Sequence, residues 1–122
     1  MKSYTDLEQS KKLAEILPLE SADMYYSKYD TIHANTLYGS CDIEYFNIRE
    51  YIPCWSLAAL LNFIKNKCGY FELVYLSSTF DGRANKLENV YRLSTDIYDV
   101  YKNELIDACV EMILKLNEQK LL

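Results

Sequence analysis

The sequence predicts an α+β fold with three helices lying mainly on one face of an antiparallel sheet of about four strands. Three segments repeat apolar residues at the three-to-four-residue spacing of a helix that buries one face. Four shorter segments are rich in β-branched and aromatic residues, as strands are. Their order is helix, strand, strand, helix, strand, strand, helix (αββαββα), which favours hairpin pairing over a helix bundle or parallel βαβ units.

The length of the chain fits this architecture. Its 122 residues are sufficient to bury a core without disulfides or a structural metal, so one globular domain over residues 1–122 is expected. Half of the residues are apolar and a quarter are charged, which is ordinary for a globular protein and argues against disorder.

The first helix is predicted to begin after Thr5. Thr5 and Glu8 have the spacing of a capping box, in which a threonine at the N-cap is followed three residues later by a glutamate. Pro18 is expected to end the helix. The residues expected on its inner side are Leu7, Leu13, Ala14 and Leu17.

Two strands are predicted next, at residues 22–29 and 41–48. In the first, Met24 and Tyr26 alternate with Tyr25 and Tyr29, a period of two that is typical of a strand. The second alternates in the same way between residues such as Tyr45 and Phe46. The polar stretch 30–40 is predicted to connect them, with an extended piece at 34–38 left open.

The central helix follows the most apolar run of the chain, residues 52–64, which contains the only tryptophan. Pro53 keeps the chain extended before the helix, and Ser56 is a preferred N-cap residue. Trp55 and Leu60 then occupy the two positions that pack together as a hydrophobic staple. A helix that is apolar around most of its circumference is expected in the middle of the fold, ending at Gly69.

The third and fourth strands are predicted at residues 70–76 and 87–93. The first of these is apolar or aromatic at nearly every position, which favours a strand inside the sheet. Asp81-Gly82 is a turn signal, so the two strands are expected to form a hairpin. Residues 94–102 have two interpretations, an early start of the last helix or a tyrosine-rich loop.

The last helix is predicted to begin at Asn103, with Glu104 and Asp107 placing negative charge in its first turn. Glu111 and Lys115 have the spacing of an ion pair on its exposed side. Its buried face is expected to consist of Ile106, Cys109, Val110, Ile113 and Leu116.

Composition argues against several classes of function. A net charge of -5 lacks the positive surface typical of nucleic-acid binders, so no direct nucleic-acid binding is expected. No apolar run approaches the roughly 18 residues of a membrane span, and the amino terminus turns polar at once, so a cytoplasmic protein is expected. Three glycines form no phosphate-binding loop, and the four cysteines have no metal-site spacing, so no cofactor or metal is expected.

One alternative is a small hydrolase or transferase that uses a thiol or acidic residues. His33 is the only histidine that could activate a cysteine, but it lies in a polar connection, and packing thiols are the favoured interpretation. Asp23 with Asp30, or Asp96 with Asp99, could act as acid and base, although such pairs are common among eighteen acidic residues.

The tyrosines are the unusual feature of the composition, twelve in all. A tyrosine buries its ring while its hydroxyl stays in water, so it suits both the margin of a small sheet and a surface that binds another protein. Tyr25, Tyr29, Tyr38 and Phe46 are therefore the candidate partner-binding residues, and a homodimer is one form that such binding could take. The motif of Pro53, Trp55, Ser56 and Leu60 is interpreted as structural.

Three stretches together resemble small uncharacterised proteins encoded on bacterial prophages and conjugative elements. They are residues 9–13 leading to Ser21-Ala22-Asp23-Met24-Tyr25-Tyr26, residues 52–61 with the form Pro-x-Trp-Ser-Leu-x-x-Leu-Leu, and residues 105–113. Asn103-Glu104 stands where such proteins often carry a proline. The resemblance implies an accessory protein of a phage or mobile element that acts by protein contact, and it transfers no catalytic residue.

Overall fold

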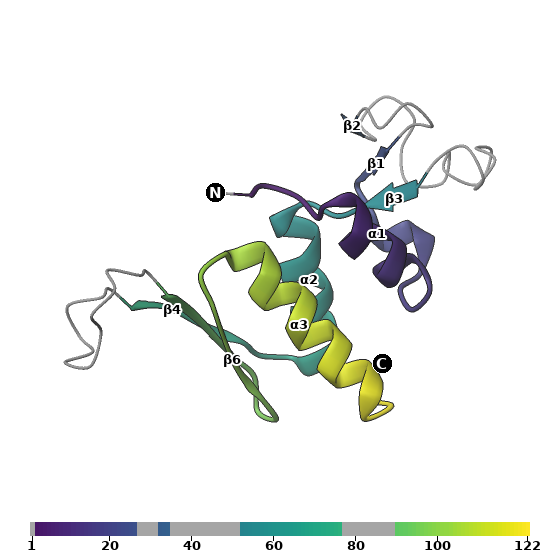
Figure 1. The fold of residues 1–122 in the computed structure, drawn as a ribbon. Helices are drawn as coiled ribbons and strands as arrows, with labels where there is room; N and C mark the ends of the chain where they lie inside the picture. The colour runs from purple at the N-terminus through teal and green to yellow at the C-terminus, as the bar shows by residue number, and fades with distance from the viewer. Residues whose placement is uncertain (1, 27–31, 35–51, 77–89) are drawn as a thin grey trace. The chain divides into compact units, whose positions relative to one another are not determined.

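The fold is α+β, as predicted. The computed structural model describes residues 2–26, 32–34, 52–76 and 90–122 (Figure 1). The helices of this part are α1 (Leu7–Ala14), the 3₁₀ helix η1 (Leu19–Ser21), α2 (Leu57–Cys68) and α3 (Leu105–Glu118). Its strands are β1 (Met24–Tyr26), β2 (Ile32–Ala34), β3 (Ile52–Cys54), β4 (Glu72–Leu76), β5 (Val90–Ser94) and β6 (Asp99–Lys102).

The described strands form two antiparallel sheets, with orders β2-β1-β3 and β4-β5-β6, so the prediction of a single four-stranded sheet is wrong. The twelve-residue helix α2 separates β3 from β4 along the chain, and each strand pairs with neighbours on its own side of that helix. Consecutive strands pair most readily because the connection between them is short.

The chain divides into two compact units. One is Ser3–Phe63, and the other consists of Met1–Lys2 with Ile64–Leu122. The division falls inside the continuous helix α2, between Phe63 and Ile64.

In the first unit, β1 is the middle strand and its two neighbours are short. Tyr25 pairs with His33 of β2 and with Pro53 of β3. A proline is tolerated there because β3 lies at the edge of the described sheet, where one side of the strand needs no hydrogen-bond donor. The predicted second strand, residues 41–48, lies outside the described residues.

The amino-terminal cap of α1 differs from the prediction by one residue. Asp6 is the N-cap: its carboxylate Oδ1 accepts the Gln9 N–H at 2.7 Å, and Gln9 Oε1 accepts the Asp6 N–H at 3.0 Å. Thr5 and Glu8 do not form the box, because Thr5 has no exposed surface and its hydroxyl is used elsewhere. The helix ends at Ala14, before Pro18.

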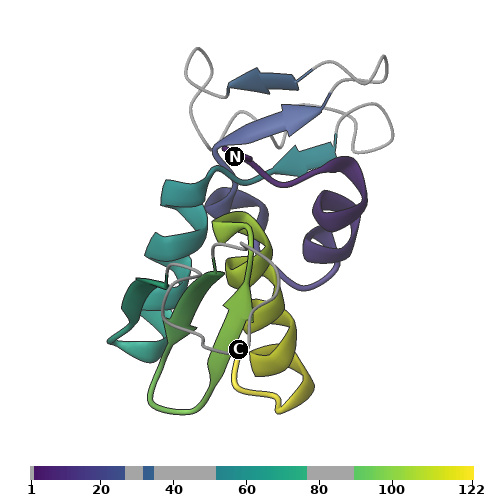
Figure 2. The ribbon, with the colours of Figure 1, turned by 60° about the vertical axis from the view of Figure 1, so that its left-hand side comes forward.

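In the second unit, α3 packs on β5 and β6 (Figure 2). The predicted hairpin is present as antiparallel β4 and β5, although its Asp81-Gly82 turn lies outside the described residues. Residues 99–102 form β6, so neither interpretation of 94–102 is right. The Thr95 hydroxyl explains the connection, since it accepts the N–H groups of Ile97 and Tyr98 at 3.3 Å and closes a tight turn.

The two long helices largely follow their patterns. All five residues predicted for the inner face of α3 are buried. The N-cap of α3 is Glu104 instead of Asn103, and Glu111 pairs with Lys102 of β6 at 3.2 Å instead of with Lys115. Helix α2 ends at Cys68 and is followed by Gly69, whose φ of 76° lies in the left-handed region that glycine tolerates.

Candidate functional site

The run around Trp55 has a structural role in the first unit. Ser56 caps α2, because its hydroxyl oxygen accepts the Ala59 N–H at 3.2 Å. The Asp23 carboxylate accepts both the Ser56 hydroxyl and the Ser56 N–H, the latter at 2.9 Å. Trp55 and Leu60 have no exposed surface, and Pro53 is buried. The polar groups of Asp23 and Ser56 therefore hydrogen-bond to one another and to the start of α2, which leaves few of them to bind a substrate.

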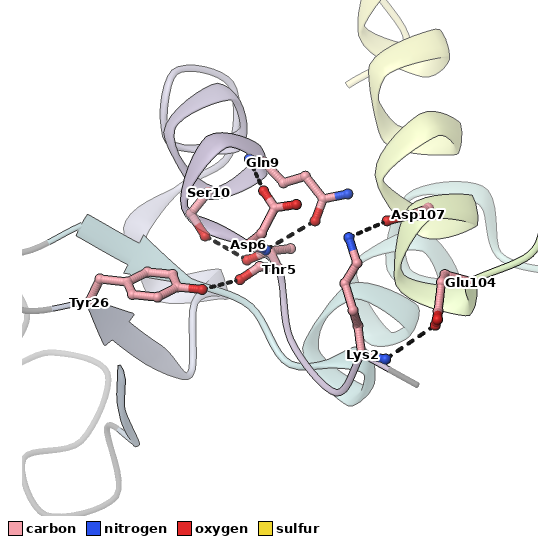
Figure 3. A network of polar contacts seen from close by, with 8 residues as sticks. All are labelled: Lys2, Thr5, Asp6, Gln9, Ser10, Tyr26, Glu104 and Asp107. Carbon is pink, nitrogen blue, oxygen red and sulfur yellow. Dashed lines mark hydrogen bonds and ion pairs between the residues drawn. The ribbon is translucent and has the colours of Figure 1, made fainter. Parts of the chain in front are cut away.

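A buried polar cluster lies next to this motif (Figure 3). Thr5 is its centre: its hydroxyl accepts the Trp55 N–H at 3.2 Å and lies 2.7 Å from the Ser10 hydroxyl. The Tyr26 hydroxyl donates to the Thr5 carbonyl at 2.7 Å. Backbone hydrogen bonds from Thr5 N–H to Trp55 and from Leu57 N–H to Ser3 complete the attachment of residues 3–5 to the start of α2. The cluster connects residues 3–5 to β3 and to the start of α2.

In the second unit, Lys2 binds the first turn of α3 (Figure 3). Its backbone N–H donates to Glu104 Oε2 at 3.1 Å, and its ammonium Nζ lies 2.7 Å from Asp107 Oδ1. The two side chains of the ion pair are about one-third exposed. This contact occupies the Glu104 carboxylate, which makes no capping hydrogen bond to a backbone N–H of α3.

The described thiols are poor nucleophiles. Cys54, Cys68 and Cys109 are free, and Cys54 and Cys109 have no exposed surface. Burial raises the pKa of all three, and raises the pKa of Cys109 to about 12. The thiolate is the reactive form, so these cysteines are largely unreactive at neutral pH. Cys41 and the side chain of His33 lie outside what the structure describes.

The predicted partner-binding residues are placed only in part. Tyr25 is 8% exposed and belongs to the core of the first unit. Tyr29, Tyr38 and Phe46 lie outside the described residues. The large apolar side chains that the structure does expose in the second unit are Tyr70, Leu73, Tyr75, Ile97, Tyr101 and Leu121.

The side of the β4-β5-β6 sheet that faces α3 is only partly covered. Leu73, Leu93 and Val100 lie opposite one another in register and therefore share this side. Their exposed fractions are 37%, 0% and 2% from β4 to β6; α3 packs on β5 and β6, and Leu73 of β4 is left partly exposed. In the next row Tyr75 is 52% exposed, and its ring lies 5.2 Å from that of Tyr91. We call Leu73, Tyr75 and Tyr91 the β4 patch.

The opposite side of the same sheet combines an ion pair with apolar groups. Arg92 Nη2 lies 3.1 Å from Glu72 Oε1, and the Tyr70 hydroxyl donates to Glu72 Oε2 at 3.0 Å. Tyr101 stands opposite Arg92 and is 53% exposed. Val74 and Leu76 of β4 are half-buried on this side. Strand β4 therefore exposes apolar groups on both of its faces.

The sequence of β4 predicts burial, whereas the structure exposes this strand. Tyr70 to Leu76 is apolar at nearly every position, and such a run predicts a strand buried on both faces. The structure instead places β4 at an edge of the described sheet, with Leu73 and Tyr75 exposed. The same pattern fits a strand whose faces are covered by another chain.

Within the described residues, no group of three or more histidine, cysteine or acidic side chains is arranged to hold a metal ion. None of the described helices has the length and apolar character needed to cross a membrane. Comparisons with protein-family models, curated proteins and solved structures found nothing that matches this chain.

Proposed function

We propose that this protein acts by binding another protein through the β4-β5-β6 sheet. The observation that carries the proposal is the β4 patch: Leu73 is 37% exposed beside the buried Leu93, and Tyr75 is 52% exposed beside the half-buried Tyr91. Contiguous exposed apolar groups on a folded protein mark interaction sites. Tyrosine is enriched at such sites because it gives a large contact area and a hydroxyl that can hydrogen-bond.

The setting of the proposed contact is an accessory role in a phage or other mobile element, in the cytoplasm. That setting rests on the resemblance carried by residues 9–13 and 21–26, 52–61, and 105–113. Free thiols at all three described cysteines are compatible with a reducing compartment. The net charge of -5 makes a basic protein surface a suitable partner around the rim of the contact, where charge complementarity speeds association.

A small hydrolase or transferase is the weaker candidate. The raised pKa values of Cys54, Cys68 and Cys109 keep their thiols protonated, which disfavours nucleophilic catalysis by any of them. The Asp23 carboxylate accepts hydrogen bonds from the hydroxyl and the N–H of Ser56. Asp96 and Asp99 are exposed residues of the β5-β6 connection and of β6.

The proposal is tested by affinity recovery of partners from the native host with the full chain as bait. The test variant carries Leu73→Ser and Tyr75→Ser, which remove the exposed apolar groups of β4 without introducing charge. We expect it to lose the partner that the unchanged chain retains, because such exposed aromatic and aliphatic anchors contribute most of the energy of a contact.

The matched control is Leu121→Ser, since Leu121 is 46% exposed but lies beyond the end of α3. It should retain the partner. Recovery of the same partner by the test variant and by the unchanged chain would show that β4 is not the binding surface.

A further inference from the structure

We propose that the partner at β4 is a second copy of this chain, which adds its own β4 antiparallel to the first, with the two Val74 residues opposite each other. This inference rests on the proposed function, because it uses the surface described there. It follows from the charges on the two edge strands, from the apolar residues on both faces of β4 and from the position of the only charged residue of β4.

The two edges of the described β4-β5-β6 sheet differ in charge. β6 carries Asp99 at one end and Lys102 at the other, and charged residues on an edge strand discourage pairing with another chain. β4 carries only Glu72, which is already paired with Arg92 of its own chain. The remaining four residues of β4 are uncharged and apolar. Among the described strands, β4 is therefore the edge whose residues discourage pairing less.

The partner strand must be apolar on both faces. Leu73 and Tyr75 are exposed on the α3 side of the sheet, and Val74 and Leu76 are half-buried on the other. A strand with alternating polar residues would cover one of these sets and place polar groups against the other. β4 itself has the required pattern, so a second copy supplies a matching strand.

The register follows from side-chain direction and charge. Opposite residues in an antiparallel pair share a face, so a two-fold pairing must place a residue opposite itself. With Val74 at the centre, each Leu73 faces the Tyr75 of the other copy, and the exposed groups of the β4 patch cover one another. The two Glu72 residues then stand four positions apart, roughly 13 Å along the strands. This separation exceeds the screening length of about 8 Å in physiological salt, so their repulsion is small.

The expected dimer is weak. Five paired residues on each copy bury less than the roughly 800 Å² per partner of a standard stable interface. We therefore expect a dissociation constant in the micromolar to millimolar range, and a dimer that a tighter heterologous partner can displace.

Sedimentation equilibrium of the full chain over concentrations up to about 1 mM tests the inference. The unchanged chain should show reversible dimerisation. Tyr75→Lys should raise the dissociation constant at least about tenfold, because it places a charge opposite Leu73 at the seam. Tyr101→Lys is the matched control: Tyr101 has the same exposure, 53% against 52%, but lies on β6, and its substitution should leave the constant unchanged. Circular dichroism and the melting temperature of each variant establish that it is folded.

A second measurement needs no variant. Amide hydrogen exchange of the unchanged chain should slow within residues 72–76 as the concentration rises, while residues 99–102 exchange at a constant rate. A chain that stays monomeric throughout, or one in which Tyr75→Lys and Tyr101→Lys weaken the dimer equally, would overturn the inference. If the chain is monomeric but the Leu73 and Tyr75 serine variant still loses a host partner, the proposed function stands and only the second copy is excluded.

Discussion

At the scale of single residues, Trp55 is the side chain on which the first unit depends most. It has no exposed surface, and its indole Nε1 donates to the Ser21 hydroxyl at 2.9 Å. Trp55→Ala should lower the free energy of unfolding by about 3–5 kcal/mol, because it leaves a large cavity. Chemical denaturation followed by circular dichroism measures this loss.

A second substitution separates packing from hydrogen bonding at the same site. Trp55→Phe keeps much of the ring volume but loses the hydrogen bond to Ser21, so it should cost less than the alanine variant. If Trp55→Ala left the denaturation midpoint unchanged and abolished partner binding, the motif would be functional and the structural interpretation wrong.

Cys109 links stability to pH. Burial raises its pKa from the ordinary value of 9.0 to about 12, so the folded chain favours the neutral thiol. The contribution to stability is fully present below pH 9 and is lost as the pH rises from about 9 to about 12. Denaturation midpoints of the unchanged chain should fall over that window. Cys109→Ala should be less stable at neutral pH, but its midpoint should fall less across the same window.

At the scale of secondary-structure elements, the neighbouring residues Asp6 and Thr5 have different roles, since Asp6 caps α1 and Thr5 accepts the Trp55 N–H. Asp6→Ala should cost about 1 kcal/mol, the usual loss for an N-cap that accepts a backbone N–H. Thr5→Val should cost about 1–3 kcal/mol, because it leaves the buried Trp55 N–H without an acceptor. Glu8→Ala is the control, since Glu8 is exposed and lies outside the cap, and its effect should stay within about 0.5 kcal/mol. Equal losses for Glu8 and Asp6 variants would contradict this assignment of the cap.

The ion pair between Lys2 and α3 is expected to contribute little to the free energy of unfolding. Because both side chains of the Lys2 and Asp107 pair are about one-third exposed, solvent screens the pair and it contributes at most about 1 kcal/mol. Lys2→Ala should therefore destabilise the chain slightly at low salt, and its cost should shrink in about 1 M salt. Denaturation of both proteins at the two salt concentrations tests this; a cost that does not depend on salt would show that the ion pair is not its source.

Helices were predicted from the sequence far better than strands. The periodic stripe of α3, from Ile106 to Leu116, and the end of α2 at Gly69 depend on local spacing and local backbone preference. The cap of α1 was misplaced because Thr5 is a good N-cap by type, whereas its burial against Trp55 depends on residues fifty positions away.

The strands depend on such distant partners throughout. β3 contains Pro53, a residue that argues against a strand unless the strand lies at an edge. β6 was not predicted because the first and last of its four residues are charged. Only its pairing with β5 places Val100 on the buried side of the sheet. The grouping of strands into two sheets could not be predicted, because nothing local to a strand specifies which other strand it pairs with.

The partner-binding residues predicted from the sequence do not coincide with the tyrosines that the structure exposes. A tyrosine-rich partner surface was expected in the first half of the chain, where Tyr25 is instead buried. The tyrosines that are exposed among the described residues, Tyr70, Tyr75 and Tyr101, lie in the second unit. A run such as Tyr70 to Leu76 has the same apolar pattern whether its cover comes from its own chain or from another, so the sequence alone does not distinguish an inner strand from a binding edge.

At the scale of the whole molecule, the chain is two compact units that share the helix α2, and the proposed binding surface belongs to one of them. Substitutions in the first unit that leave the chain folded, such as Asp6→Ala, should therefore leave binding intact. Binding by the Asp6→Ala variant, compared with the unchanged chain by affinity recovery, checks this; loss of the partner without loss of folding would place the contact on the first unit.

Amide hydrogen exchange of the chain, free and in complex with the recovered partner, tests the central claim most directly. Binding through the β4-β5-β6 sheet predicts slower exchange at Glu72–Leu76 in the complex, with little change in Met24–Tyr26. Slower exchange confined to the first unit, with Glu72–Leu76 unaffected, would contradict the account.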